Sequence, residues 1–265
     1  MAETFIASNT QPASVVSPVL TNGCDLSKWQ DDPATIREID FKKMYAEGMR
    51  FVYIRATLGD TNDANFVQAW KDAKEAGLLR GAYHAHQFWL GLSQCQRFIN
   101  RIVNDPGELP PAFDLERGGI GAANRTAVTL RMREAIGAID FELVKWNRPF
   151  GKKMILYTNP DIIVNFLGNN LPAWLLEHEL WVAHYGVSSP NIGWQYKRFL
   201  FHQYTDRGPG LKYGVESKQL DLDYFNGDYA SLLRFCGLDQ PETPPGEKTL
   251  EERVAVLEAW VKAHG

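Results

Sequence analysis

This chain of 265 residues has few cysteines, no long apolar run and no excess of basic residues. The three cysteines, Cys24, Cys95 and Cys236, are odd in number and show no CxxC spacing, which argues against a disulfide framework and a zinc ribbon. No stretch approaches the roughly 18 apolar residues of a membrane-spanning helix. Lys and Arg number 28 against 32 Asp and Glu, a net charge of −4. We therefore expect buried thiols, no membrane insertion and no nucleic-acid partner.

The remaining composition is that of a globular protein, with 45% hydrophobic, 12% aromatic and 23% charged residues. These values exclude a disordered or collagen-like chain. Eight Trp and ten Tyr are a mild excess. Large flat side chains of this kind bind carbohydrate, although they also fill cores.

Short β-type segments recur along the chain. They cover residues 23–27, 50–57, 80–86, 110–116, 153–158, 180–185, 199–205 and 219–225. Amphipathic helical patterns separate the first five segments, for example at 66–77 and 124–146, whereas Gly-, Pro- and Ser-rich loops separate the last three. The pattern predicts one α/β domain, an irregular TIM-like (β/α)5(β)3 barrel.

The barrel is expected to span residues 22–238, between two extensions. Residues 1–21 read as an extended arm, 239–248 as a Pro-rich linker and 249–265 as a short amphipathic C-terminal helix. The apolar positions of this helix step by four, three and four residues, as in a coiled coil. Two readings stay open, a helix that folds back or links onward and a helix that mediates weak self-association.

Acidic residues gather where the predicted strands end, and barrels of this type carry their chemistry at the C-terminal ends of the strands. Asp25 ends the first strand, Asp114 and Glu116 the fourth, and Asp221 the eighth. Asp114 and Glu116 are two apart and share a face, so mutual repulsion would raise one pKa and create a general acid. A strand-end Asp can also be a turn former or helix cap. We interpret Asp223 as such a structural residue, an orienting or capping group.

Eight motifs follow one another across residues 22–238: DLSKWQ (25–30), FVYIRAT (51–57), GAYHAH (81–86), AFDLE (112–116), ILYT (155–158), LWVAHYG (180–186), HQYT (202–205) and LDLDYFNG (220–227). In order and spacing they resemble the family 25 glycoside hydrolases, the Chalaropsis-type lysozymes that include many phage endolysins. The resemblance implies a bacteriolytic N-acetylmuramidase without a cofactor, which hydrolyses the β-1,4 bond between N-acetylmuramic acid and N-acetylglucosamine in bacterial peptidoglycan.

The resemblance also implies roles for the acids. The general acid of the family falls on Glu116, and the supporting carboxylates fall on Asp25, Asp114 and Asp221. Either a second carboxylate attacks the sugar or activates water, or the 2-acetamido group of the substrate attacks, oriented by Asp114. We favour the substrate-assisted form.

Six further residues at or near the strand ends are candidates for sugar binding. They are Trp29, Tyr83, Trp181, Tyr185, Gln203 and Tyr204. Core packing, or for Gln203 a satisfied buried amide, is the alternative for each.

The chain departs from the family pattern in three places. Leu58 stands where the family usually has an acid before Gly. The third motif of the family usually runs Tyr-His-Phe, and here Ala85 and His86 follow His84. The C-terminus has no recognisable wall-binding repeat.

Two rival readings stay open. His84 and His86, with His184, His202 and Asp221, could form a zinc hydrolase. A barrel in a virion or tail assembly could instead bind peptidoglycan without cleaving it. Our assignment contains no metal.

The first 20 residues lack a basic region followed by a compact apolar core. The expectation is a chain without a signal peptide. It would be made in a host cytoplasm and reach the cell wall as endolysins do, or act extracellularly.

Overall fold

A computed structural model describes residues 20–31, 38–146, 153–168 and 170–238, and the single positions 254 and 262. The predicted arm up to residue 19, the linker and nearly all of the C-terminal helix lie outside the described residues. Weak self-association through 249–265 therefore stays a prediction.

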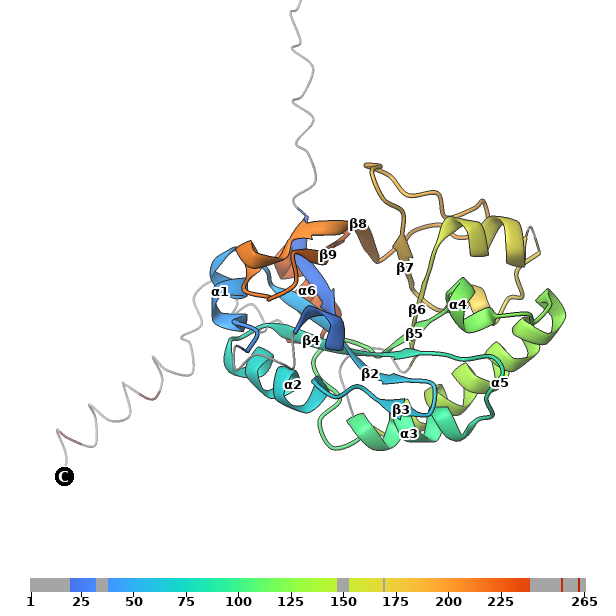
Figure 1. Ribbon diagram of the computed structural model, residues 1–265, viewed down its shortest axis with the longest axis horizontal. Helices are drawn as coiled ribbons and strands as arrows, with labels where there is room; N and C mark the ends of the chain where they lie inside the picture. Colours follow the sequence, from blue (N-terminus) through green and yellow to red (C-terminus); the bar gives the residue numbers. More distant parts are fainter. Residues whose placement is uncertain are drawn as a thin grey trace, which may run out of the picture.

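A closed, mixed β-barrel forms the centre of the molecule (Figure 1). Its eight strands close through pairing of β1 with both β2 and β9, and a short ninth strand, β3, extends β2 as a hairpin. β1 and β8 are each antiparallel to β9, and the other barrel pairs are parallel. The strands are β1 (Thr21–Leu26), β2 (Phe51–Leu58), β3 (Thr61–Asn62), β4 (Leu79–Ala85), β5 (Ala112–Asp114), β6 (Ile155–Thr158), β7 (Leu180–Ala183), β8 (Phe201–Pro209) and β9 (Gln219–Phe225).

Helices follow the early strands, as the sequence predicts. The α-helices are α1 (Phe41–Ala46), α2 (Phe66–Glu75), α3 (Ser93–Ile102), α4 (Arg117–Ile120), α5 (Arg125–Leu143) and α6 (Tyr229–Phe235). A π-helix, η2 (Asp161–Leu167), follows β6, and short 3₁₀ turns η1 (Lys28–Gln30), η3 (Leu175–Glu177) and η4 (Gly210–Tyr213) complete the set. The stretches before β8 and between β8 and β9 carry no α-helix, so the (β/α)5(β)3 prediction is confirmed.

Alternation along the strands separates an inner from an outer layer. Inside the barrel, Phe51 and Tyr53 of β2 pack against Trp181 and Phe201. Gly23 and Gly81 make room for these rings: a Cβ at either position would lie within 2.5 Å of the ring of Phe51 or Tyr53. The interior below the mouth is therefore a solid aromatic core.

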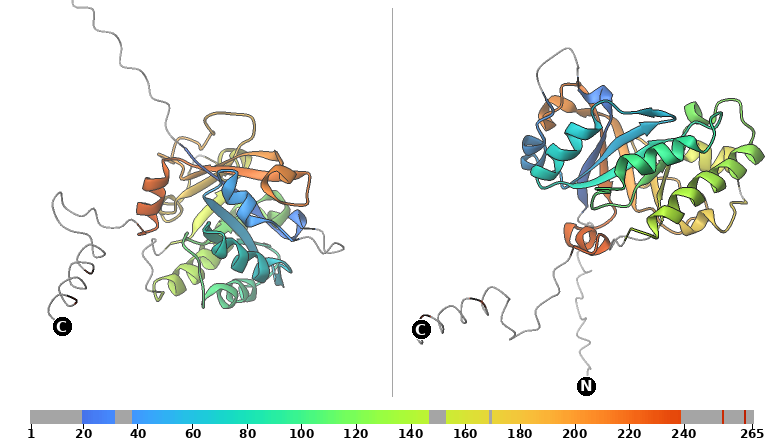
Figure 2. Two further views of the ribbon diagram at one scale, coloured as in Figure 1. Left: turned by 90° about the vertical axis from the view of Figure 1, so that its left-hand side faces the viewer. Right: turned by 90° about the horizontal axis from the view of Figure 1, so that it is seen from below.

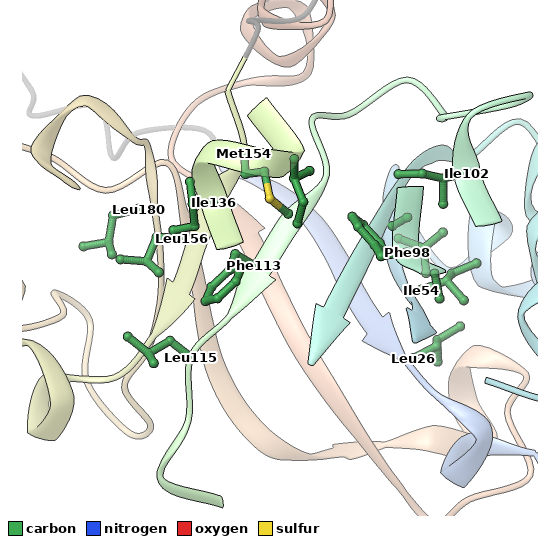
Figure 3. Packing of buried hydrophobic residues seen from close by; sticks show 14 of the residues in the cluster. Leu26, Ile54, Phe98, Ile102, Phe113, Leu115, Ile136, Met154, Leu156 and Leu180 are labelled. Carbon is green, nitrogen blue, oxygen red and sulfur yellow. The ribbon is translucent and has the colours of Figure 1, made fainter. Parts of the chain in front are cut away.

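Outside the barrel, apolar side chains fill the layer between the strands and the helices. Figure 3 shows Leu26 and Ile54 facing Phe98 and Ile102 of α3 in this layer. Phe113 and Leu156 lie in the same cluster. This packing fixes the direction in which each strand ends.

Helix α6 closes the end of the barrel at which the parallel strands begin. Its Leu232 and Cys236 belong to the interior cluster that contains Phe51 and Leu79. Figure 2 shows α6 apart from α2, α3 and α5, at one end of the strands. The opposite end, where the parallel strands finish, is left for a site.

Element boundaries differ from the sequence prediction in a few places. β1 begins at Thr21, whose hydroxyl donates to the carbonyl of Gly227, so the barrel starts one residue earlier than expected. β5 ends at Asp114, and Glu116 lies beyond it in extended backbone before α4. Among the described residues, none of the helices is long and apolar enough to cross a membrane.

Candidate active site

A pocket of about 370 Å³ opens at the mouth of the barrel, at the C-terminal ends of the parallel strands. Its wall includes all four predicted acids. They are Asp25, Asp114, Glu116 and Asp221. In β1 and β9, Asp25 and Asp221 are directly paired across the antiparallel ladder, so barrel closure brings together residues far apart in sequence.

Asp114 and Glu116 line the same pocket in different environments. Asp114 is buried, and its Oδ1 has no hydrogen-bond partner among the residues that the structure describes. Burial and the charge of Glu116 raise the pKa of Asp114 well above its ordinary value, and Arg55 opposes this shift. Glu116 is exposed at the mouth, yet desolvation by the surrounding protein also raises the pKa of its carboxyl. Both carboxyls thus favour the protonated form more than a free acid does, and they lie in one pocket.

Gln203 is the centre of a hydrogen-bond network that includes Asp25. Gln203 Nε2 donates to Asp25 Oδ2 at 2.6 Å, and Gln203 Oε1 accepts from the hydroxyls of Tyr157 (2.9 Å) and Tyr185 (2.7 Å). Burial and the charges of Asp221 and Asp223 raise the pKa of Asp25. The hydrogen bond from Gln203 fixes the orientation of the Asp25 carboxyl.

Substitution of Gln203 is expected to lower stability. Gln203→Leu leaves Asp25 and two tyrosine hydroxyls without this partner, which should lower the free energy of unfolding by about 1–3 kcal/mol. Chemical denaturation measures the change. Gln219→Leu, on an exposed position of β9, is the matched control and should change it by less than about 0.5 kcal/mol. Equal effects of the two substitutions would contradict the importance of the network.

Asp221 couples the site to pH. Desolvation, with the charges of Asp206 and Glu116, raises its pKa from 3.8 to about 6. The folded state thus binds this proton more tightly than the unfolded state, so the stabilisation is complete below about pH 4 and is lost as the pH rises through about 6.

The free energy of unfolding of Asp221→Asn relative to the wild type should therefore rise by about 1–3 kcal/mol as the pH increases from about 4 to about 6.5. Denaturation at a series of pH values tests this, with Asp60→Asn at an exposed position as the control. A difference that does not change with pH would refute the linkage.

The predicted sugar-binding residues divide into three groups. Trp29, at 71% exposure, and Tyr185, at 45%, line the pocket with open rings, and Tyr83 lines it as a buried ring. Trp181 borders the pocket but is only 2% exposed, and its Nε1 donates to Asp223 at 2.8 Å. Its ring therefore forms the bottom of the pocket. Tyr204 is not among the residues that line the pocket and stacks on Tyr224, so its sugar-binding role stays a prediction.

Asp223 is fully buried and fixes Trp181, consistent with an orienting role. The capping role belongs instead to Asp228, which caps α6 by accepting from the backbone N–H of Ser231.

Arg55 and Tyr157 are among the pocket residues that the sequence did not single out. Arg55 follows Phe51 and Tyr53 on the inward face of β2, and its Nε donates to the buried carboxylate of Asp63 at 2.9 Å. Tyr157 is the next-to-last residue of β6 and also points into the barrel. A basic residue within an apolar strand was the available signal for Arg55, and the strand-end position was the signal for Tyr157.

The histidines do not form the cluster that a zinc hydrolase would need. His84 faces outward and stacks on Phe98 of α3, whereas His86 borders the pocket. His184 accepts from the backbone N–H of Asn191, and His202 contacts Tyr224 Oη and the carbonyl of His184. Among the described residues, the group of possible ligands around His84 contains neither these two histidines nor Asp221.

The chain is similar to several known proteins. The family model described as glycosyl hydrolases family 25 matches residues 24–211. Lysozyme M1 of Streptomyces globisporus is 30% identical over 219 residues, 80% of this chain and 69% of the relative. The N,O-diacetylmuramidase of Arthroderma benhamiae is 30% identical over 225 residues, 81% of this chain and 86% of the relative.

A solved structure is also similar. The bacterial lysozyme from Streptomyces coelicolor has a TM-score of 0.65 and 25% sequence identity to this chain. The match covers 83% of this chain and 98% of that protein.

Proposed function

The chain belongs to glycosyl hydrolase family 25, and from this premise we infer that it is an N-acetylmuramidase, a lysozyme that hydrolyses the β-1,4 bond between N-acetylmuramic acid and N-acetylglucosamine in bacterial peptidoglycan. One observation carries the assignment of roles: a pKa-raised Glu116 and a buried Asp114 with a free oxygen share one pocket at the barrel mouth. The place of action is the bacterial cell wall.

Glu116 is assigned as the general acid. Cleavage requires a proton on the leaving glycosidic oxygen, and desolvation raises the pKa of the Glu116 carboxyl, which favours the protonated form that can donate it. Glu116 is also exposed at the mouth, where a polysaccharide chain can reach it. After the leaving group departs, the resulting carboxylate can accept a proton from the attacking water.

Asp114 is assigned as the group that orients the substrate. Its unpartnered Oδ1 suits the N–H of a 2-acetamido group. The acetamido carbonyl oxygen then attacks the anomeric carbon while the glycosidic bond breaks, giving a cyclic oxazolinium ion that water opens. Asp221, whose pKa is raised only to about 6, contributes negative charge to the same wall at neutral pH, which favours the positive charge that develops on the sugar. Asp25 lies beside it on β1.

Aromatic rings at the mouth are proposed to bind the sugars, and Trp29 offers the most exposed face. Trp29→Ala should raise KM by about 2–12-fold, the equivalent of about 0.5–1.5 kcal/mol, with a smaller change in kcat. Trp194→Ala is the control, since Trp194 is 67% exposed but lies outside the pocket lining. Steady-state kinetics on a soluble peptidoglycan fragment would contradict the proposal if both variants behaved alike.

The experiment that tests the function identifies the new reducing ends. Purified peptidoglycan is digested, reduced with borohydride and hydrolysed to its amino sugars. Reduced muramic acid is the expected product. Reduced glucosamine would identify a glucosaminidase instead, and binding without released fragments would identify a non-catalytic peptidoglycan-binding barrel.

A further inference from the structure

Three potential metal ligands lie together outside the acid pocket, between the barrel and α3. His84 is the next-to-last residue of β4, His86 directly follows the strand, and Cys95 is in the first turn of α3. All three are at most 3% exposed. Their ligand atoms lie within 4.8 Å of one another, and they are the group of this kind found among the described residues. The proposed cleavage reaction uses none of them.

We propose that His84, His86 and Cys95 form a binding site for one Zn²⁺ ion, which supports the fold and takes no part in glycoside cleavage.

The spacing of the two imidazoles fits this ion. His84 Nε2 and His86 Nδ1 are 3.2 Å apart. Two nitrogens at about 2.0–2.1 Å from a tetrahedral zinc are about 3.3 Å apart, so the pair is already at the required separation. A Zn–S bond of about 2.3 Å places sulfur about 3.6 Å from each nitrogen, so the thiol approaches by about an ångström at most. Two imidazoles and a thiolate are ligands that Zn²⁺ prefers over harder cations.

Thr57 supplies the outer contact that such a site needs. Its Oγ1 lies 2.7 Å from His84 Nδ1, and the hydroxyl is fully buried. With Nε2 bound to zinc, the ring hydrogen of His84 lies on Nδ1 and is donated to Thr57, which fixes the tautomer and the ring plane. The zinc ion takes the place of the hydrogen that lies between His84 Nε2 and His86 Nδ1. Each ring then carries one hydrogen, on its other nitrogen, and stays neutral. The thiol of Cys95 releases one proton to solvent.

The ion has a route to the site. His86 borders the acid pocket and also a neighbouring pocket of about 270 Å³ lined by Trp89 and Arg131. A water molecule from either side can supply the fourth ligand, as in zinc sites with three protein ligands. Zinc at this position would tie the end of β4 to α3. It would also fix His86, whose backbone N–H donates to the carbonyl of Asp114 at 3.3 Å.

The test uses the full chain, reduced and freed of metal with a chelator. Titration with Zn²⁺ alone by calorimetry is expected to give one site per chain and a higher midpoint of thermal unfolding. Titration with Co²⁺ alone is expected to give the thiolate-to-cobalt charge-transfer absorption in the near ultraviolet, which a site without sulfur cannot produce.

Substitution of two of the proposed ligands, with one control, locates the ion. Cys95→Ser should abolish the charge-transfer band and weaken Zn²⁺ binding at least about tenfold. Cys236→Ser, a buried cysteine in the barrel interior cluster, is the control and should leave both unchanged. His86→Phe keeps a ring between Phe88 and Phe113 but removes one ligand, so it should weaken binding to a similar extent and remains informative if Cys95→Ser does not fold.

Two results would overturn the proposal: no binding by the wild-type chain, or unchanged binding in both Cys95→Ser and His86→Phe. Peptidoglycan cleavage by the metal-free chain is measured separately and should match that of the untreated chain. Failure of the zinc site and failure of the muramidase assignment are therefore distinguishable.

Discussion

Glu116→Gln is expected to lower kcat on peptidoglycan by about 10²–10⁴-fold, the range that loss of a general acid produces. The amide keeps the size of the side chain but cannot donate a proton of comparable acidity to the leaving oxygen. Because Glu116 is exposed, KM and the midpoint of thermal unfolding should stay close to those of the wild type. Clearing of a cell-wall suspension and steady-state kinetics on a soluble fragment measure the effect.

Glu75→Gln is the matched control for this substitution. Glu75 is exposed on α2 and pairs with Lys71 at the surface, away from the pocket. It should clear walls at the wild-type rate. Equal clearing by Glu116→Gln and the wild type would remove Glu116 as the acid, and clearing that chelators abolish would replace the proposed mechanism with metal-dependent hydrolysis.

Asp114→Asn is expected to lose activity while it gains stability. The neutral amide orients the acetamido group poorly and cannot balance the positive charge of the oxazolinium ion, so kcat should fall by about 10²-fold or more. Removal of a buried carboxylate with one unpartnered oxygen should raise the free energy of unfolding at pH 7 by about 1 kcal/mol. Kinetics and denaturation on the same preparation test the two effects together.

An inhibitor separates the two forms of the mechanism. A thiazoline analogue of the oxazolinium ion should bind the wild type and bind Asp114→Asn at least about tenfold more weakly. Asp60→Asn, at an exposed position, is the control and should bind the analogue as the wild type does. Detection by mass spectrometry of a sugar covalently bound to an acid of the pocket would contradict the substrate-assisted form and identify a protein nucleophile instead.

The position of the acids could be predicted from the sequence because it follows from two general rules. Parallel barrel strands end at one mouth, and closure brings the first strand beside the last. Asp25, Asp114, Glu116 and Asp221 follow those rules and line one pocket. The family resemblance adds roles to positions that the strand count had already placed.

Local irregularities account for what the sequence could not predict. Tyr204 lies where the register between β8 and β9 shifts, between Gln203 and Thr205, so simple alternation no longer gives its direction. Side chains alternate along β4. Tyr83 and Ala85 point into the barrel, and His84 between them points out toward α3. Burial of Trp181 depends on side chains from other strands, among them Tyr53 and Tyr157.

Closure of the barrel by its first and last strands has a consequence for the timing of folding. Asp25 meets Gln203 across 178 residues and faces Asp221 on β9. Contacts between such distant segments form slowly, because a long loop must close before they are made. As long as β9 has not left the ribosome, the sheet of the growing chain is open. The acids of the pocket are then not yet assembled. We therefore expect cleavage activity to appear only after synthesis has passed residue 225, in one late step.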